Sequence, residues 1–150
     1  LDCFAHFYEK YEYKENKFIA VGSIEPQFYS ELLEKLEIDD KKFLDQYNKE
    51  LWPELKGLIA LKIKSKTRYE WIEIFSESDA CVTPVLDMQE AQDHPHNVSR
   101  KAFINIDGFN QPNASPRYSK TKLEIKHNAK EVGVDLDDIC NEFNISKEAF

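Results

Sequence analysis

The sequence predicts an α+β fold in which a small, mostly antiparallel sheet has helices packed on one of its faces. Two observations lead to this prediction. Strand-like segments near the N-terminus are followed by segments whose apolar residues recur at helical spacing, and strands and helices then mix without regular alternation. With 150 residues, the chain is long enough to bury one core without disulfides or metal ions.

The first predicted element is a β-hairpin formed by residues 7–13 and 17–23. Both segments are rich in aromatic and β-branched residues, and a polar link separates them. With a loop centred on that link, antiparallel pairing places Tyr8 roughly opposite Ser23. The start of the first strand then lies beside the end of the second, so we expect Tyr8 and Glu25 to be neighbours.

Three helices are predicted next, over residues 26–36, from 53 to about 63, and 67–76. Each of the first two begins with a proline, whose missing backbone donor would be unpaired at that position anyway. The third begins at a Thr-x-x-Glu capping box. Gly57 lies inside the second helix and costs it about 1 kcal/mol relative to Ala, so packing must outweigh that cost.

Shorter elements are predicted in the second half of the chain. Residues 81–86 are predicted to form an edge strand or a strand end because a proline interrupts them, and the pair Asp87 and Glu90 opens a short helix. A further strand is expected over 102–107, followed by a long loop or linker over 108–119. Residues 136–143 carry the pattern of a short amphipathic helix.

These elements suggest two parts. We expect residues 1–110 to form the small α+β domain, and residues 111–150 to form a linker and a C-terminal helical extension that would return to a larger domain. The chain begins at Leu1 rather than Met, which suggests a piece of a longer protein.

Composition excludes several classes of function. The net charge of −8 argues against nucleic acid or an anionic membrane as the main partner. No apolar run approaches the roughly 20 residues of a membrane span. The three cysteines form no CxxC pair, which argues against a disulfide framework or a zinc cluster and favours a reducing compartment. The one basic cluster is interpreted as a solvated helix end: Lys62, Lys64, Lys66 and Arg68.

Glu25 is the strongest candidate for a functional residue. It lies where a predicted strand meets a predicted helix, and unpaired backbone donors there favour a negative charge by about 0.3–1 kcal/mol. By residue chemistry alone, a helix-capping role outweighs a functional one. Glu is nevertheless a poorer cap than Ser or Asp, and such junctions often carry functional groups.

Other candidates are weaker. His94 and His96 are two residues apart in an expected turn and could supply two metal ligands, but a zinc site needs at least three, so imidazoles bonded to backbone are the simpler interpretation. Cys81 lies in an apolar run and is expected to be buried. Tyr8 and Tyr118 could donate protons but are more often packing residues. No glycine-rich phosphate loop is present, and no metal or cofactor is predicted.

Four stretches together resemble the family III CoA-transferases of the α-methylacyl-CoA racemase type: AHFYEKYEYKENKFIAVGSIEPQFYSELLEKL, TRYEWIEIF, DACVTPVLDMQEA and HPHNVSRKAFI. Their order and spacing match the family from residue 1 to about 119, and AVGSIEPQFY is the most specific piece. The matched region is similar to the smaller, C-terminal domain of those enzymes. His6 departs from the family pattern, in which Pro is common at this place.

The resemblance implies a cofactor-free proton transfer that inverts the methyl-bearing carbon next to a fatty acyl-CoA thioester. Such a reaction needs a base, an acid and stabilisation of the enolate oxygen. In the family, a His and Asp pair on the larger N-terminal domain supplies the acid and base. The resemblance implies that Glu25 supports this catalytic His, and that Tyr8 and Ile24 line the acyl or reacting-carbon side of the pocket.

Partners and location are also implied only by the resemblance. The substrate would be an acyl-CoA thioester, and the partners would be the larger domain and a second subunit of an interlocked homodimer. The organelle would be the mitochondrion or the peroxisome, and the chain alone would be inactive. Two alternatives stay open: a CoA-transferase of the same family, and a dimerisation or binding module without a catalytic role.

Overall fold

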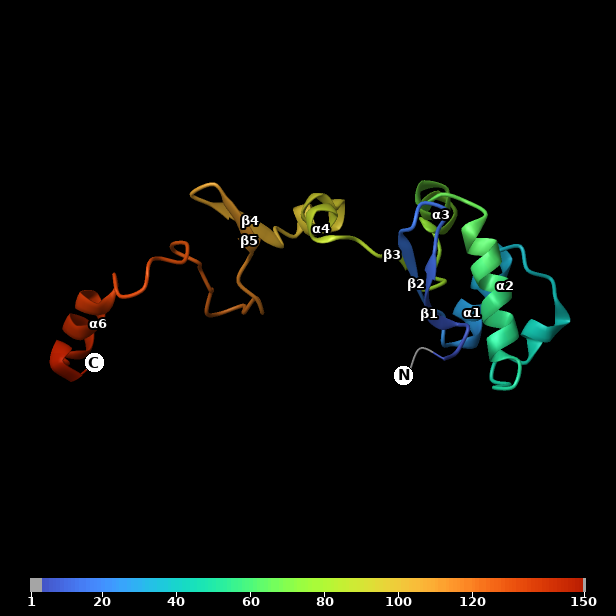
Figure 1. Cartoon of the computed structure of the whole chain (residues 1–150), viewed down its shortest axis with the longest axis horizontal. Helices are drawn as coiled ribbons and strands as arrows, with labels where there is room; N and C mark the ends of the chain where they lie inside the picture. The colour runs from blue at the N-terminus through green and yellow to red at the C-terminus, as the bar shows by residue number, and fades with distance from the viewer. Residues whose placement is uncertain (1–3, 150) are drawn as a thin grey trace. The chain divides into compact units, whose positions relative to one another are not determined.

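The structure is a computed structural model that describes residues 4–149, and it confirms the α+β class (Figure 1). Six α-helices, two short 3-10 helices and two small antiparallel sheets occur within this range. The chain divides into two compact units, Leu1–Leu86 and Asp87–Phe150. Each unit contains one of the two sheets.

The sheet of the first unit contains β1 (Tyr8–Glu12), β2 (Phe18–Gly22) and β3 (Val82–Pro84), in the order β1-β2-β3 with antiparallel pairing throughout. Tyr8 pairs with Gly22, one residue away from the expected register. The difference arises in the turn, where the Tyr13 amide donates to the Lys17 carbonyl at 2.7 Å. Tyr13 and Lys17 therefore face each other, and the hairpin is centred on Glu15. Strand β3 lies at the sheet edge, as its proline predicted.

Three helices of the first unit begin and end within about one residue of the predicted bounds. They are α1 (Pro26–Lys35), α2 (Trp52–Lys64) and α3 (Arg68–Phe75). The capping box of α3 is formed, because the Thr67 hydroxyl and the Glu70 carboxylate each accept a backbone N–H. Figure 1 shows α1 and α2 on the same side of the sheet, and α3 contacts β3.

The core of the first unit lies between the sheet and these helices. Its fully buried large side chains include Tyr13, Ile19, Leu32, Leu36, Phe43, Leu55, Ile59, Ile63 and Trp71. Removing each such side chain from water contributes about 1.5–3 kcal/mol. The Trp71 indole N–H donates to the Ile63 carbonyl, in the last turn of α2, at 2.7 Å, whereas the Lys66 amide reaches the same carbonyl only at 3.4 Å.

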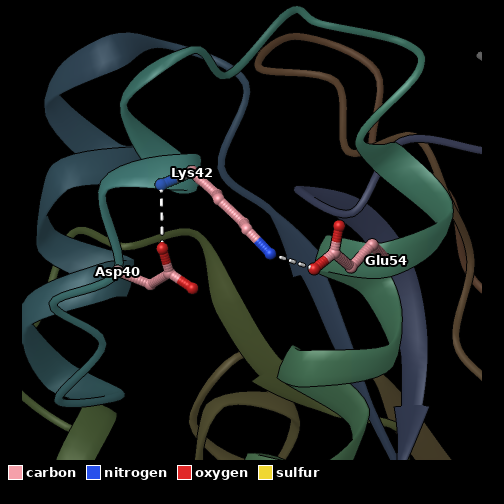
Figure 2. A network of polar contacts seen from close by, with 3 residues as sticks. All are labelled: Asp40, Lys42 and Glu54. Atoms are coloured by element: carbon pink, nitrogen blue, oxygen red, sulfur yellow. Dashed lines mark hydrogen bonds and ion pairs between the residues drawn. The ribbon is translucent and has the colours of Figure 1, made fainter.

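A short segment between α1 and α2 is anchored by one buried side chain and by polar contacts beside it. Phe43, in the 3-10 helix η1 (Lys41–Leu44), is buried. Asp40 accepts the Lys42 amide at 2.9 Å, and the Lys42 ammonium pairs with Glu54 on α2 (Figure 2). The hydrogen bond to Glu54 raises the pKa of Lys42. Because exposed ion pairs contribute little stability, Phe43 is the main anchor and the polar contacts fix orientation.

Replacing Gly57 by Ala is expected to stabilise the first unit by about 0.5–1 kcal/mol. Gly57 lies inside α2, and a Cβ added there meets no atom within 4 Å. The methyl group therefore reduces the freedom of the unfolded chain without a clash. Urea unfolding followed by tryptophan fluorescence measures this, and a lower midpoint for the Ala variant would contradict it.

The second unit contains α4 (Met88–Asp93), α5 (Pro95–Ser99), β4 (Phe103–Ile106), β5 (Phe109–Pro112), α6 (Leu136–Phe143) and the 3-10 helix η2 (Lys147–Ala149). Strands β4 and β5 form an antiparallel hairpin. Helix α6 and the capping pair before α4 were predicted and are confirmed.

Two predictions for this unit were wrong. Residues 108–119 were expected to form a loop, yet they contribute β5. Asp107 and Gly108 both have positive φ, 52° and 85°, as a two-residue hairpin turn requires, and an Asp-Gly pair is a strong signal for such a turn. The segment around His94 was expected to be only a turn, but His94 is the N-cap residue of α5.

No helix within residues 4–149 is both long and apolar enough to cross a membrane. In the same range, no group of three or more His, Cys, Asp or Glu side chains could hold a metal ion. Cys3 lies outside the described residues.

Candidate functional site

Glu25 is the N-cap residue of α1, with an extended backbone (φ −73°, ψ 144°) and an exposed side chain. Its carbonyl accepts the Tyr29 amide at 3.0 Å and so begins the helix. Its carboxylate, however, accepts no hydrogen bond from the helix. The side chain therefore does not perform the capping role that residue chemistry favoured, and no other hydrogen bond or ion pair engages it within residues 4–149.

The backbone before Glu25 is held by three side-chain contacts. The Gln46 amide nitrogen donates to the Ser23 carbonyl at 3.1 Å and to the Ile24 carbonyl at 2.9 Å. The Tyr47 hydroxyl also donates to the Ile24 carbonyl, at 2.8 Å. The peptide that joins Ile24 to Glu25 is thereby fixed, which is what a site residue needs if its carboxylate is to be held in one place.

Gln46 and Tyr47 were not identified from the sequence. Gln46 is 7% exposed, and the Trp52 indole N–H donates to its carbonyl at 2.9 Å, so it is firmly held. Both residues lie outside any helix or strand and their acceptors are 22 or 23 residues away in the chain. A buried amide in an irregular segment gives no periodic signal, so only the folded structure reveals these contacts.

A hollow of about 590 Å³ lies over the ends of the three strands near Glu25, and we call it the sheet hollow. Ile19 and Val21 of β2 are buried in the core, so the alternate residues of that strand face the other side of the sheet. Small residues on this outer face leave room beside Tyr8. The lining includes Tyr8, Lys10, Ala20, Gly22, Cys81 and Thr83.

Of the three predicted site residues, one lines this hollow. Tyr8 lines it and pairs with Gly22. Ile24 is partly buried against the core and does not line it. Glu25 is also absent from the lining, and no hydrogen bond joins it to Tyr8 within the described part of the chain, but its charge acts on Cys81, which does line the hollow.

Cys81 is exposed, which corrects the expectation that it is buried. It has a positive φ of 54° immediately before β3, which turns the chain at the strand end, and its carbonyl accepts the Gly22 amide at 2.9 Å. The pKa of its thiol is raised, first by partial burial of the sulfur and then by the negative charges of Glu25, Asp79 and Glu31. The thiol is therefore protonated at neutral pH and is a poor nucleophile.

Replacing Glu25 by Gln is expected to speed the alkylation of Cys81 by iodoacetamide at pH 8 by about two- to threefold. Loss of the negative charge lowers the thiol pKa, and the thiolate is the reacting form. Mass mapping of the Cys81 peptide measures the rate. Glu34→Gln is the matched control, because Glu34 lies on the same helix but is not among the charges that act on Cys81. Equal rates in both variants would contradict the prediction.

The remaining candidates do not join this site. His94 and His96 lie in the second unit, at the start of α5. Tyr118 is 56% exposed in the same unit. The basic residues at the end of α2 are engaged separately: Lys62 pairs with Glu37 at 2.9 Å and Lys64 with Glu12 at 3.3 Å.

Comparison with known proteins places this site in context. The chain is 38% identical to an alpha-methylacyl-CoA racemase of Mus musculus and 37% identical to one of Homo sapiens, in each case over 99% of this chain and 39% of the relative. It therefore spans about two fifths of the length of these curated relatives.

Solved structures agree on the fold. A CAIB/BAIF family protein from Brucella suis superposes with a TM-score of 0.72 over 93% of this chain and 38% of that protein, at 14% identity. Residues 2–135 match the family model described as CoA-transferase family III. With relatives of this identity along its whole length, the chain belongs to CoA-transferase family III.

Proposed function

We propose that this chain is the C-terminal part of an α-methylacyl-CoA racemase, in which Glu25 supports a catalytic His carried by a larger N-terminal domain. The observation that carries the proposal is the unengaged carboxylate of Glu25 on a backbone fixed by Gln46 and Tyr47. The similarity to the mouse and human alpha-methylacyl-CoA racemases supports the reaction class.

The proposed chemistry explains why such a carboxylate is needed. The proton next to a thioester carbonyl is weakly acidic, so its removal requires a base of raised basicity and a stabilised enolate. A carboxylate that accepts the N–H of an imidazole selects one tautomer, orients the ring and raises its basicity. Glu25 would act on the base and not on the substrate, which makes it a positioning residue.

We further propose how the rest of the site is arranged. Tyr8 and Ile24 would line the acyl or reacting-carbon side of the pocket, and the sheet hollow beside Tyr8 offers the space. Residues 1–110 would form the small domain and 111–150 the linker and extension. The complete enzyme would be an interlocked homodimer in the mitochondrion or the peroxisome, and this chain alone would be inactive.

Incubation with a pure (R)-2-methylacyl-CoA in D2O tests the function. The complete protein is expected to introduce deuterium at the α-carbon and to form the (S) epimer, whereas the 150-residue chain alone is expected to do neither. Exchange catalysed by the chain alone would refute its inactivity. Absence of exchange in the complete protein would refute the racemase.

Transfer of CoA between carboxylates is the second candidate, because a Caenorhabditis elegans relative, 34% identical over 73% of this chain, is described as a CaiB/baiF CoA-transferase family protein. Adding a free carboxylic acid to the same assay separates the two. A new thioester of the added acid indicates transfer, whereas epimerisation without it indicates the racemase.

A further inference from the structure

Positive charge is concentrated in one part of an otherwise acidic chain. Residues 94–130 contain seven Lys and Arg but two Asp and Glu, although the whole chain has a net charge of −8. In the first unit, by contrast, most basic side chains form an ion pair with a carboxylate or a cation–π contact with an aromatic ring, as at the end of α2. The concentration in residues 94–130 is therefore not a general property of the surface.

Most of these cations have no partner of opposite charge. Lys130 pairs with Asp135, but the other six form no ion pair with any carboxylate of residues 4–149. These six are Arg100, Lys101, Arg117, Lys120, Lys122 and Lys126. Such a set of like charges, close along the chain, raises the local potential and favours an anion.

Two of the six line one hollow. Arg100 and Arg117 are both part of the wall of a space of about 520 Å³, which we call the arginine hollow. The rest of its wall comes from residue 102 and residues 112–116, which include the last residue of β5. This volume is in the range of small-molecule sites.

Arg117 is held in place without losing its capacity to bind. Its Nη2 donates to the Lys101 carbonyl at 3.0 Å and also to the Arg100 carbonyl. The Nε and Nη1 donors have no protein acceptor within the described residues. Asn113 donates to the same Lys101 carbonyl at 2.9 Å and stiffens this wall. A guanidinium fixed on one side with donors left on the other is suited to the oxygens of an anion.

A second, smaller hollow of about 300 Å³ adjoins the first, since both are lined by Asn113, Ala114, Pro116 and Arg117. The rest of its wall comes from Tyr118, Lys122, Leu123 and one acidic residue, Glu124. The arginine hollow has no acidic residue in its wall. An anion is therefore expected between the two arginines, and a larger attached group beside Tyr118.

We propose that the arginine hollow binds a phosphate group, through Arg100 and Arg117. A dianionic phosphate offers enough acceptor oxygens for two guanidinium groups, and the small volume favours a small molecule over an acidic protein. The group could be free phosphate or a phosphoester of a larger ligand such as the nucleotide part of CoA. The site does not depend on the proposed racemase, because free phosphate alone can test it.

Titration of the 150-residue chain with inorganic phosphate at constant ionic strength, followed by NMR of backbone amides, tests the site. Saturable shifts are expected around residues 100–102 and 112–117. Arg100→Gln is expected to weaken binding about tenfold, since a charge-assisted hydrogen bond is lost. Arg100 is chosen because its side chain makes no hydrogen bond in the described residues, so folding is preserved and is checked by circular dichroism.

Lys126→Gln is the matched control, because Lys126 belongs to the same basic segment but lines neither hollow. It should change the affinity less than twofold. Equal weakening in both variants, unsaturable shifts, or acetate binding as tightly as phosphate would overturn the proposal. Titrations with adenosine 3′,5′-bisphosphate, CoA and dephospho-CoA separate the two sources of the phosphate group. If CoA and the bisphosphate bind more tightly than inorganic phosphate, and dephospho-CoA does not, the ligand is the nucleotide part of CoA. If inorganic phosphate binds as tightly as these nucleotides, the ligand is free phosphate.

Discussion

Replacing Glu25 by Gln in the complete enzyme is expected to lower the rate of α-proton exchange by about 10- to 100-fold, the usual effect of removing a carboxylate that orients a functional imidazole. The neutral amide can still accept a hydrogen bond, but it no longer raises the basicity of the ring. Because the Glu25 side chain makes no cap hydrogen bond, the change leaves α1 formed and costs it only the interaction of the charge with the helix dipole, about 0.3–1 kcal/mol. Deuterium incorporation at the α-carbon measures the rate.

Two controls separate a positioning role from a structural one. Glu34→Gln removes an equal charge from the same helix and should change the rate less than twofold. The pH profile of kcat/KM should also move in the Glu25 variant, so that its acidic limb lies at lower pH, because the imidazole acts as the base and its pKa falls when its carboxylate partner is lost. A lower rate with an unmoved pH profile would assign Glu25 to structure instead.

The parts of this fold that were predicted depend on local chemistry. Pro26 begins a helix because its ring fixes φ, and the Thr67 to Glu70 capping box closes on itself within four residues. Both signals lie entirely in neighbouring residues. The β4–β5 hairpin was equally local, since Asp107 and Gly108 form its turn, and it was missed because the polar residues that follow suggested a loop.

The parts that could not be predicted depend on contacts between distant residues. Gln46 reaches Ile24 from an irregular segment, and no spacing rule connects the two. The charge of Glu25 reaches Cys81 because β3 pairs with β2, which brings positions more than 50 residues apart to one sheet edge. Whether the Glu25 carboxylate caps its helix is likewise a matter of side-chain direction. The sequence leaves both roles open, and the structure shows that the Glu25 side chain makes no cap hydrogen bond.

His6 is a buried histidine that the sequence marked only as a departure from the family pattern. It is 0% exposed, and its Nε2 lies 2.7 Å from the Tyr29 hydroxyl. That hydroxyl donates its single hydrogen to the Phe43 carbonyl at 3.1 Å, so Nε2 must carry the hydrogen that joins His6 to Tyr29. The other ring nitrogen, Nδ1, is buried without a hydrogen-bond partner in the described residues.

A proton on Nδ1 would add a charge where no acceptor is available. The neighbouring rings of Phe7, Tyr29 and Phe43 meet the imidazole edge to face, at centroid distances of 5.1, 5.4 and 5.7 Å. Burial in this aromatic cluster lowers the pKa of His6 to about 4. The folded chain therefore holds His6 neutral, whereas the unfolded chain binds a proton below its ordinary pKa of about 6.5.

The first unit is expected to lose about 3 kcal/mol of stability as the pH falls from 7 to 4, because only the unfolded state takes up the His6 proton in that window. Below the folded pKa the His6 contribution becomes constant. Burial opposes the ionisation of Glu9, but the hydrogen bonds and positive charges of Lys56 and Lys10 together outweigh it and lower the Glu9 pKa. Glu9 therefore adds its own loss of stability as the pH falls through its ordinary pKa of 4.5 and below. Urea midpoints followed by the fluorescence of Trp52 and Trp71 measure the stability of this unit.

His6→Phe tests the assignment, because a benzene ring keeps the aromatic packing and cannot titrate. The free energy of unfolding of this variant should change little between pH 6.5 and 4.5. At neutral pH the variant should be less stable than the wild type by about 1 kcal/mol, because the hydrogen bond to Tyr29 is lost. His127→Gln, in the second unit, is the matched control and should retain the wild-type slope. If His6→Phe retained that slope, the acid sensitivity would belong to carboxylates, and the neutral imidazole would contribute packing alone.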